Sequence, residues 1–184
     1  ITSVIGADLQ RTGLFKLVDT SGASPHIPAD VVFPDWVNRG ASALVIGRTV
    51  AMPGDQVEIQ FRLMDVSKKT QLTGLGITVP SSQLRSAAHR IADVIYEVLT
   101  GDVGVFSTRI AYVLKQGNKY ALQVADADGY NAQSIIEYNE PIISPAWSPD
   151  GNRVILDSNK QKAGRICANT CDTATPCGCQ FQRK

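Results

Sequence analysis

The stretch Ile143-Ser144-Pro145-Ala146-Trp147-Ser148-Pro149-Asp150-Gly151-Asn152-Arg153-Val154 decides how the second half of the chain folds. Pro149 fixes its φ angle near the value that the second position of a tight turn requires, and Asp150-Gly151 tolerates the left-handed corner that follows. Trp147 is a large apolar side chain just before this turn, and apolar residues resume at Val154. The stretch therefore predicts the end of one strand, a tight turn and the start of another strand.

Short strands surround this stretch from about Val103 onward. Alternation of apolar and polar residues predicts strands over 109–114, 120–125 and 133–138, and turn-forming residues separate them at 115–118 and 126–131. Short strands with a turn every dozen residues or so are typical of a sandwich, a barrel or a propeller. The pattern predicts that the part of the chain after residue 102 is all-β.

The first 102 residues mix helical and strand patterns. Helical spacing of apolar residues predicts an amphipathic helix that stops at Gly13, a short helix over 34–40 and a long helix over 84–99. Strands are predicted over 15–19, 43–50, 56–66 and 71–79. We therefore expect residues 1–102 to form an α/β domain with its helices laid on one side of a small mixed sheet.

The composition of the chain excludes some classes of function. The chain has 184 residues, of which 43% are apolar, so it can bury a core. It contains 18 Lys and Arg against 17 Asp and Glu, which gives a formal net charge of +1. This balance provides no strong field for attracting nucleic acid or an anionic membrane, and no apolar run approaches membrane-spanning length.

The last segment, 156–184, loses the alternating pattern and holds all four cysteines, Cys167, Cys171, Cys177 and Cys179. Their spacing lacks the paired C-x₂₋₄-C of a zinc ribbon or knuckle, so we do not expect zinc or an iron–sulfur cluster. A frame shifted by one nucleotide can encode an alternating strand, turn and strand over 164–184. We therefore predict an aberrant, disordered tail at 156–184, produced by a frameshift that is either real or a sequencing artefact.

The two histidines are candidate catalytic or metal-binding residues by type. His26 lies in a loop flanked by prolines, and His89 lies on the long helix, four residues before Asp93. A single pair at this spacing is typical of a solvated helix face. We expect both histidines to be exposed or at the edge of the core, without a catalytic role.

Other motifs are incomplete. Asp126 and Asp128 resemble the start of a calcium loop with Glu137 at its twelfth position, but Tyr130 replaces a ligand and Asn131 replaces the required glycine. Turns capped by the aspartates explain the segment better. Gly74 and Gly76 lie within a strand, so they do not form a phosphate loop, and Ser144 and Ser148 lack the G-x-S-x-G context of a nucleophile. Trp147 is predicted to pack between blades rather than to stack on a ligand.

Five segments resemble one known family in the same order. They are Val4–Leu9 with Thr12–Phe15, Ala88–Asp93 with Tyr96–Gly101, Phe106–Val113, Tyr120–Val124 with Asp126 to Asn131, and Ile142–Asn152. Together they resemble the TolB family of β-propeller proteins, which carries WD40-like repeats. The resemblance covers roughly residues 1–155. It implies that residues 103–155 are the first propeller blade and the start of the next, about one blade in all.

The resemblance also implies a function. TolB proteins are soluble periplasmic components of the Tol–Pal system, which supports outer-membrane integrity and cell division, and they are not enzymes. Their propeller binds the lipoprotein Pal, and their extreme N-terminus binds TolA. In this sequence Ile1 falls after the TolA-binding extension, and about one of the family's six blades is present. We therefore expect binding of both Pal and TolA to be weakened or lost.

Two alternatives stay open at this point. The blade motif also occurs in propeller-bearing hydrolases related to prolyl oligopeptidase, whose catalytic domain would then lie outside the chain. The segments of the α/β domain distinguish the TolB family from these hydrolases, because such enzymes are not expected to have a counterpart of them. The other alternative is a nonfunctional frameshifted fragment. In all cases we expect no catalytic, metal-binding or cofactor-binding residues, and partner-binding residues stay unassigned.

Overall fold

The computed structural model describes residues 1–158 and 165–169. The chain divides into two compact units, Ile1–Ser107 (unit 1) and Thr108–Lys184 (unit 2). The division lies five residues beyond the predicted boundary at residue 102. The shift has a physical cause, since Phe106 is buried in the core of unit 1 and its backbone N–H is bound by a side chain of the long helix.

Unit 1 contains three α-helices among its described residues. They are α1 (Thr2–Arg11), α2 (Phe33–Asn38) and α3 (Leu84–Thr100), together with the short 3₁₀ helices η1 (Pro28–Asp30) and η2 (Ser81–Gln83). The predicted helices are therefore confirmed. Gly101 ends α3 with a left-handed φ of 84°, and its N–H donates to the carbonyl of Glu97 at 2.8 Å. A glycine adopts this conformation without the steric cost that a side chain would add.

The sheet of unit 1 is a meander of three strands, β1 (Ala43–Met52), β2 (Gln56–Asp65) and β3 (Thr70–Pro80), in the order β1-β2-β3. Both pairings are antiparallel, so the prediction of a mixed sheet is wrong in this respect. The fourth predicted strand, over 15–19, has no strand assignment. Phe15 instead contacts α3, with its ring edge-on to Tyr96 at a centroid distance of 6.1 Å.

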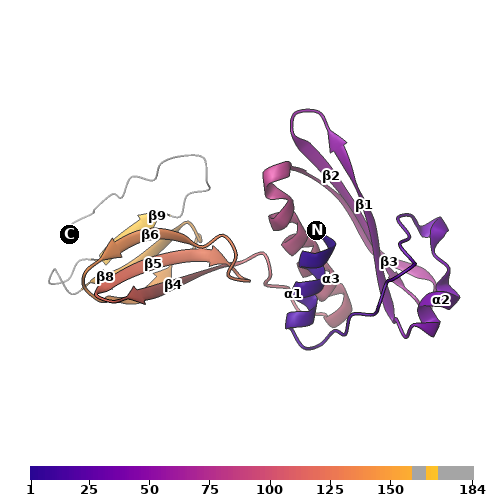
Figure 1. The fold of residues 1–184 in the computed structure, drawn as a ribbon, viewed down its shortest axis with the longest axis horizontal. Coiled ribbons are helices and arrows are strands. Elements are labelled where there is room, and N and C mark those ends of the chain that lie inside the picture. Colours follow the sequence, from indigo (N-terminus) through magenta and orange to yellow (C-terminus); the bar gives the residue numbers. More distant parts are fainter. Residues whose placement is uncertain (159–164, 170–184) are drawn as a thin grey trace. The chain divides into compact units, whose positions relative to one another are not determined.

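Both faces of this sheet are covered, as Figure 1 shows. Helices α1 and α3 lie together on one face, where Ile59, Phe61 and Leu63 of β2 join the main core. The opposite face, with Leu44, Ile46 and Met64, packs against Trp36 of α2. The strand alternates between the two faces because successive side chains point in opposite directions. The helices therefore lie on both sides of the sheet rather than on one side as predicted.

The amphipathic pattern of α3 accounts for the main core. Its buried residues include Ala88, Ile91, Ala92 and Ile95, all with an exposed fraction of 0%. They recur at helical spacing and so share one face. Burying each isoleucine side chain contributes about 1.5–3 kcal/mol to stability.

Unit 2 consists of two three-stranded antiparallel sheets among its described residues. One contains β4 (Arg109–Gln116), β5 (Lys119–Asp126) and β6 (Gln133–Tyr138). The other contains β7 (Ile142–Trp147), β8 (Arg153–Ser158) and β9 (Arg165–Asn169). The sheets share one apolar cluster, in which Leu122, Val154 and Leu156 are each 0% exposed. The predicted all-β character is therefore confirmed.

The predicted start of the tail at residue 156 falls inside β8. Leu156 is two residues from Val154 along the strand, so both side chains point to the same buried face. Strand β9 pairs with β8 from Arg153↔Asn169 to Asp157↔Arg165. The prediction of disorder thus differs from the structure at 156–158 and 165–169, where the backbone of β8 pairs with that of β9. Residues 159–164 and 170–184, including Cys171, Cys177 and Cys179, lie outside the described residues.

Candidate functional site: polar anchors and an open cavity

A buried polar pair joins α1 to α3. His89 Nδ1 lies 2.5 Å from Asp8 Oδ2, and the two residues are 2% and 1% exposed. Arg11 Nη2 donates to the other carboxylate oxygen at 3.1 Å. His89 was expected to be exposed or at the edge of the core, and it is instead buried, because α1 covers that side of α3. The pair crosslinks two helices whose residues are 81 positions apart in the sequence.

Asp8 was not identified from the sequence, although a signal for it exists. Ile5, Asp8 and Leu9 are the buried residues of α1, and their spacing of three and four places them on one helix face. A carboxylate between two core residues requires a partner when it is buried. The sequence does not reveal which residue provides that partner, since the partner comes from a different helix.

Asp93 binds the segment that follows α3. Its Oδ1 accepts the N–H of Phe106 at 2.6 Å, and its Oδ2 accepts the N–H of Ser107 at 3.1 Å. Gly104 lies against the same side chain, because a Cβ at this position would come within 2.5 Å of the Cα of Asp93. Asp93 therefore fixes the path of residues 104–107 along α3 rather than pairing with His89.

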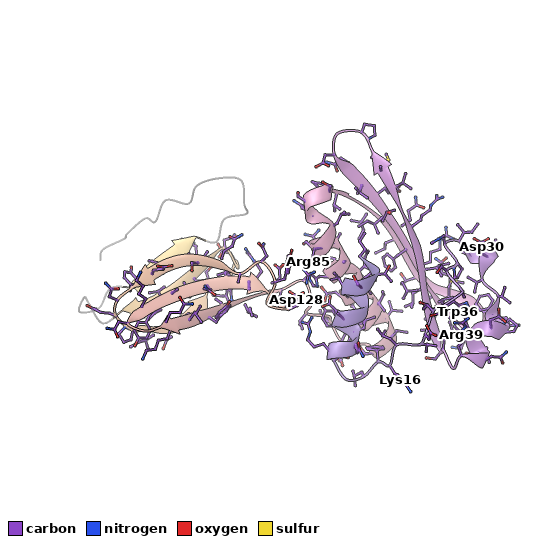
Figure 2. All side chains as sticks on the ribbon, viewed as in Figure 1. Lys16, Asp30, Trp36, Arg39, Arg85 and Asp128 are labelled. Atoms are coloured by element: carbon purple, nitrogen blue, oxygen red, sulfur yellow. The ribbon has the colours of Figure 1, made fainter. Side chains whose placement is uncertain are left out.

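The loop between α1 and α2 is held by Arg39. Its guanidinium donates to the carbonyls of Asp19 at 2.8 Å and Ser21 at 3.1 Å. The same group lies over the ring of Trp36 of α2, 5.5 Å from the centroid, and Figure 2 labels the two side chains close together, with Arg39 directly after the helix. His26 lies in this loop, and its Nδ1 is 3.3 Å from the carbonyl oxygen of Gly47. His26 is exposed, as expected.

Three aspartates in turns and loops have pKa values below the ordinary value of a carboxyl group. Hydrogen bonds from the hydroxyl and N–H of Ser21 lower the pKa of Asp19. The N–H of Lys68 and the hydroxyl of Ser67 lower the pKa of Asp65. The hydroxyl of Ser148 and the N–H of Asn152 lower the pKa of Asp150. These hydrogen bonds favour the charged form, and each of them closes a turn or loop.

The predicted Asx turn is confirmed at Asp128, whose Oδ1 accepts the N–H of Tyr130 at 2.9 Å. Asn131 adopts a left-handed φ of 55° in the same turn. Glu137 lies in β6, where it is exposed. Asp126 ends β5, so the three carboxylates belong to two strands and the turn between them rather than to a helix–loop–helix calcium site.

The turn after Trp147 is held by a network centred on Ser148. Its hydroxyl donates to Asp150 Oδ1 at 2.5 Å and accepts the N–H of Arg153 at 3.0 Å. Gly151 takes the left-handed φ of 67° that the sequence predicts for this corner. The hydroxyl of Ser148 therefore serves the turn. Ser144 has a left-handed φ of 51° within β7, where the pairing with β8 is irregular.

Trp147 lies partly buried beside the apolar cluster of unit 2. The guanidinium of Arg109, on β4, sits over its ring at 5.5 Å from the centroid. Arg109 Nη2 also donates to the carbonyl of Gly151 at 3.3 Å. Trp147 thus lies between the two sheets of unit 2, which confirms its predicted packing role.

A cavity of about 950 Å³ opens within unit 1, beside β1. It is lined by residues of α1, α3, the loop after α1 and the run Ala43–Thr49 of β1. Volumes of roughly 300–1,000 Å³ are typical of ligand-binding clefts. The sequence did not predict this cavity, because its walls come from several separate segments, which also include β2 and Trp36 of α2.

Two family models match the chain. The TolB amino-terminal domain matches residues 1–72, and the TolB beta propeller domain matches residues 96–177. The propeller match extends into the segment that was predicted to be aberrant. The amino-terminal match discriminates against the hydrolase alternative, since no such domain is expected in prolyl-oligopeptidase relatives. Among the described residues, no helix is both long enough and apolar enough to cross a membrane.

Curated relatives are similar over most of the chain. The Tol-Pal system protein TolB of Nitrosospira multiformis is 68% identical over 151 residues, which cover 82% of this chain and 35% of that protein. The protein of the same name from Nitrosomonas europaea is 55% identical over 173 residues, covering 94% of this chain and 41% of that protein. The chain therefore spans well under half the length of these relatives.

A solved structure agrees with the fold. The crystal structure of TolB from Acinetobacter baumannii aligns with a TM-score of 0.80 at 32% identity, covering 90% of this chain and 42% of that chain. The order of the two family matches, an amino-terminal domain followed by a beta propeller domain, agrees with the order of unit 1 and unit 2 along the chain. This chain belongs to the TolB family, and it contains the family's amino-terminal domain and the beginning of its propeller.

Proposed function

We propose that the chain is a non-catalytic, protein-interaction component of the Tol–Pal system and that it acts in the periplasm. The observation that carries this proposal is the 68% identity, over 151 residues, to a protein named Tol-Pal system protein TolB. The polar side chains that the sequence singles out are consistent with it. Asp93, Asp128 and Ser148 each bind backbone groups of turns or linkers.

Pal and TolA are the partners we propose for the protein to which these residues belong. For a polypeptide of these 184 residues taken alone, we expect weak Pal binding. A standard protein interface requires about 800 Å² of surface from each partner. Two three-stranded sheets provide a small part of a surface that the family assembles from several blades.

A chimera tests the proposed function. Residues 1–156 would replace the aligned residues of the Nitrosospira multiformis TolB, and the chimera would be produced in bacteria that lack TolB. We expect it to restore resistance to detergent and to stop leakage of periplasmic enzymes. The unaltered Nitrosospira protein is the matched control. A chimera that is exported and folded, as judged by resistance to protease, but leaves the envelope leaky would contradict the proposal.

Calorimetry with purified Pal tests the expectation for the isolated 184-residue polypeptide. We expect a dissociation constant weaker than about 1 μM, which corresponds to roughly −8 kcal/mol. Micromolar or tighter binding would show that the described sheets carry the interface by themselves. That result would refute the expected weakening while leaving the proposed role in the Tol–Pal system intact.

A further inference from the structure

The turn between β7 and β8 contains an aspartate that is followed directly by a glycine, Asp150-Gly151. In such a pair the backbone nitrogen of the glycine can attack Cγ of the aspartate, because glycine has no Cβ that hinders the approach. A bond forms between this nitrogen and Cγ, the nitrogen loses its proton, and the carboxyl group loses one oxygen as water. The product is a succinimide ring within the main chain.

Water then opens the succinimide ring at either of its carbonyl carbons. Attack at the carbon of the former side chain restores aspartate, whereas attack at the main-chain carbon leaves the glycine bonded to Cγ, which is isoaspartate. The water consumed replaces the water released, so the reaction requires no oxidant or other reactant. Isoaspartate lengthens the main chain by one carbon atom. Because the length of a hairpin turn fixes the register of its strands, this change disturbs the pairing beyond the turn.

The Asp150-Gly151 pair is accessible to water. The side chain of Asp150 is 50% exposed. At Gly151, none of the described residues beyond its chain neighbours comes within 4 Å of the place that a Cβ would occupy. Ring formation and hydrolysis therefore meet no steric obstacle from neighbouring elements.

Hydrogen bonds hold both of the groups that would react. The N–H of Gly151 donates to the carbonyl of Ser148 at 2.9 Å. The carboxylate of Asp150 accepts the hydroxyl of Ser148 at 2.5 Å and the N–H of Asn152 at 3.2 Å. The ring cannot close while these bonds persist, because the glycine nitrogen must give up its proton and Cγ must turn toward that nitrogen. The turn must therefore open before the reaction occurs.

Ser148 joins the reacting carboxylate to the start of β8. Its hydroxyl accepts the N–H of Arg153 at 3.0 Å, and its own N–H donates to the carbonyl of Arg153 at 2.8 Å. The hydroxyl is also the largest cause of the lowered pKa of Asp150. A lower pKa reduces the fraction of neutral carboxyl group, which is the form that loses water most readily. The hydroxyl of Ser148 thus opposes the reaction in two ways.

We propose that Asp150-Gly151 is a site of spontaneous isoaspartate formation and that the hydroxyl of Ser148 controls the rate by keeping the turn closed. The reaction rate follows the population of the opened turn, as it does for other reactions of locally opened segments. The inference stands on the hairpin of unit 2 and does not depend on the proposed function.

Isotope labelling of the full chain measures the reaction. The unaltered chain, Ser148→Ala and Ser148→Thr are incubated at mildly acidic pH in water enriched in heavy oxygen. They are then digested in ordinary water and analysed by mass spectrometry with fragmentation that distinguishes isoaspartate from aspartate. Each ring opening leaves one heavy oxygen on the residue. We expect Ser148→Ala to increase both label and isoaspartate at Asp150 at least about fivefold, and Ser148→Thr, which keeps the hydroxyl, to change them less than about twofold.

The pair Asp128-Gly129 provides a reference within the same chain. It lies in the turn between β5 and β6, where the N–H of Gly129 donates to the carbonyl of Asp126 at 2.8 Å. We expect labelling of Asp128 to differ by less than about twofold among the three proteins, because Ser148 belongs to another hairpin.

Four results would overturn the proposal. Absence of isoaspartate at Asp150 in Ser148→Ala would show that the site does not react. Equal rates in Ser148→Ala and the unaltered chain, or in Ser148→Ala and Ser148→Thr, would show that the hydroxyl does not control the reaction. An equal rise at Asp128 and Asp150 in Ser148→Ala would show that the variant loosens the whole of unit 2 rather than this turn.

Discussion

Replacing Asp93 with alanine should destabilise unit 1 by about 2–4 kcal/mol. The carboxylate accepts two backbone N–H groups, those of Phe106 at 2.6 Å and Ser107 at 3.1 Å. A hydrogen bond to a charged group contributes about 1.5–3 kcal/mol, and the bond to the exposed Ser107 falls at or below the lower end of this range. Asp93→Asn keeps one carbonyl acceptor but turns an amide donor toward the other N–H. We expect it to lose roughly half as much stability.

Urea unfolding followed by tryptophan fluorescence measures this loss. The chain has two tryptophans, Trp36 in unit 1 and Trp147 in unit 2, so a Trp147→Phe background isolates the signal of unit 1. Asp102→Asn serves as the control, because it removes an exposed carboxylate near the same helix end. We expect the control to change the unfolding free energy by less than about 0.5 kcal/mol.

Hydrogen exchange provides an independent readout of the same bonds. In the unaltered chain the amide of Phe106 should be protected, and in Asp93→Ala it should exchange at least about tenfold faster. Unchanged protection of Phe106, together with an unfolding free energy within about 0.5 kcal/mol of the unaltered chain, would refute the reasoning. That result would mean that the burial of Phe106 alone fixes residues 104–107.

Three further predictions concern the buried pair, the blade turn and the core of unit 2. Asp8→Ala and His89→Ala should each lower the free energy of unfolding, measured in urea, by about 3–5 kcal/mol. The double variant should lower it by less than the sum of the two single losses, because the two side chains are partners. Additive losses would argue against a coupled pair. Ser148→Ala should raise the pKa of Asp150 in an NMR titration, because that hydroxyl is the largest cause of its lowering. A carboxyl group whose pKa is lowered in the folded state stabilises the fold at pH values above its unfolded pKa, and this contribution is lost as the pH falls through its folded pKa. Ser148→Ala should therefore lose less stability on acidification than the unaltered chain. An unchanged pKa of Asp150 in the variant would contradict the assigned cause. Leu122→Ala should cost about 2–5 kcal/mol by leaving a cavity between the two sheets of unit 2, and a loss below about 1 kcal/mol would show that the sheets do not pack as described.

Periodicity and turn chemistry in the sequence determined most of the elements. The spacing of apolar residues located α1 and α3, and alternation located β2 and the strands of unit 2. The left-handed corners at Gly101 and Gly151 were readable as well, since glycine adopts a positive φ at little cost. These features are local, because each depends on the dihedral preferences and side-chain directions of residues close together in the chain.

Only the tertiary structure decided which predicted strands pair, which polar residues are buried and where the cavity lies. Residues 15–19 have a strand-like sequence but form no strand, because a ladder requires a bonded neighbour and Phe15 contacts α3 instead. Likewise, the sequence predicts that His89 is exposed or at the edge of the core. In the structure α1 covers it, and Asp8 lies 2.5 Å from its ring. The cavity beside β1 is lined by segments that are distant in sequence. Burial, pairing and cavities are properties of contacts between segments, so they appear only when the chain has folded.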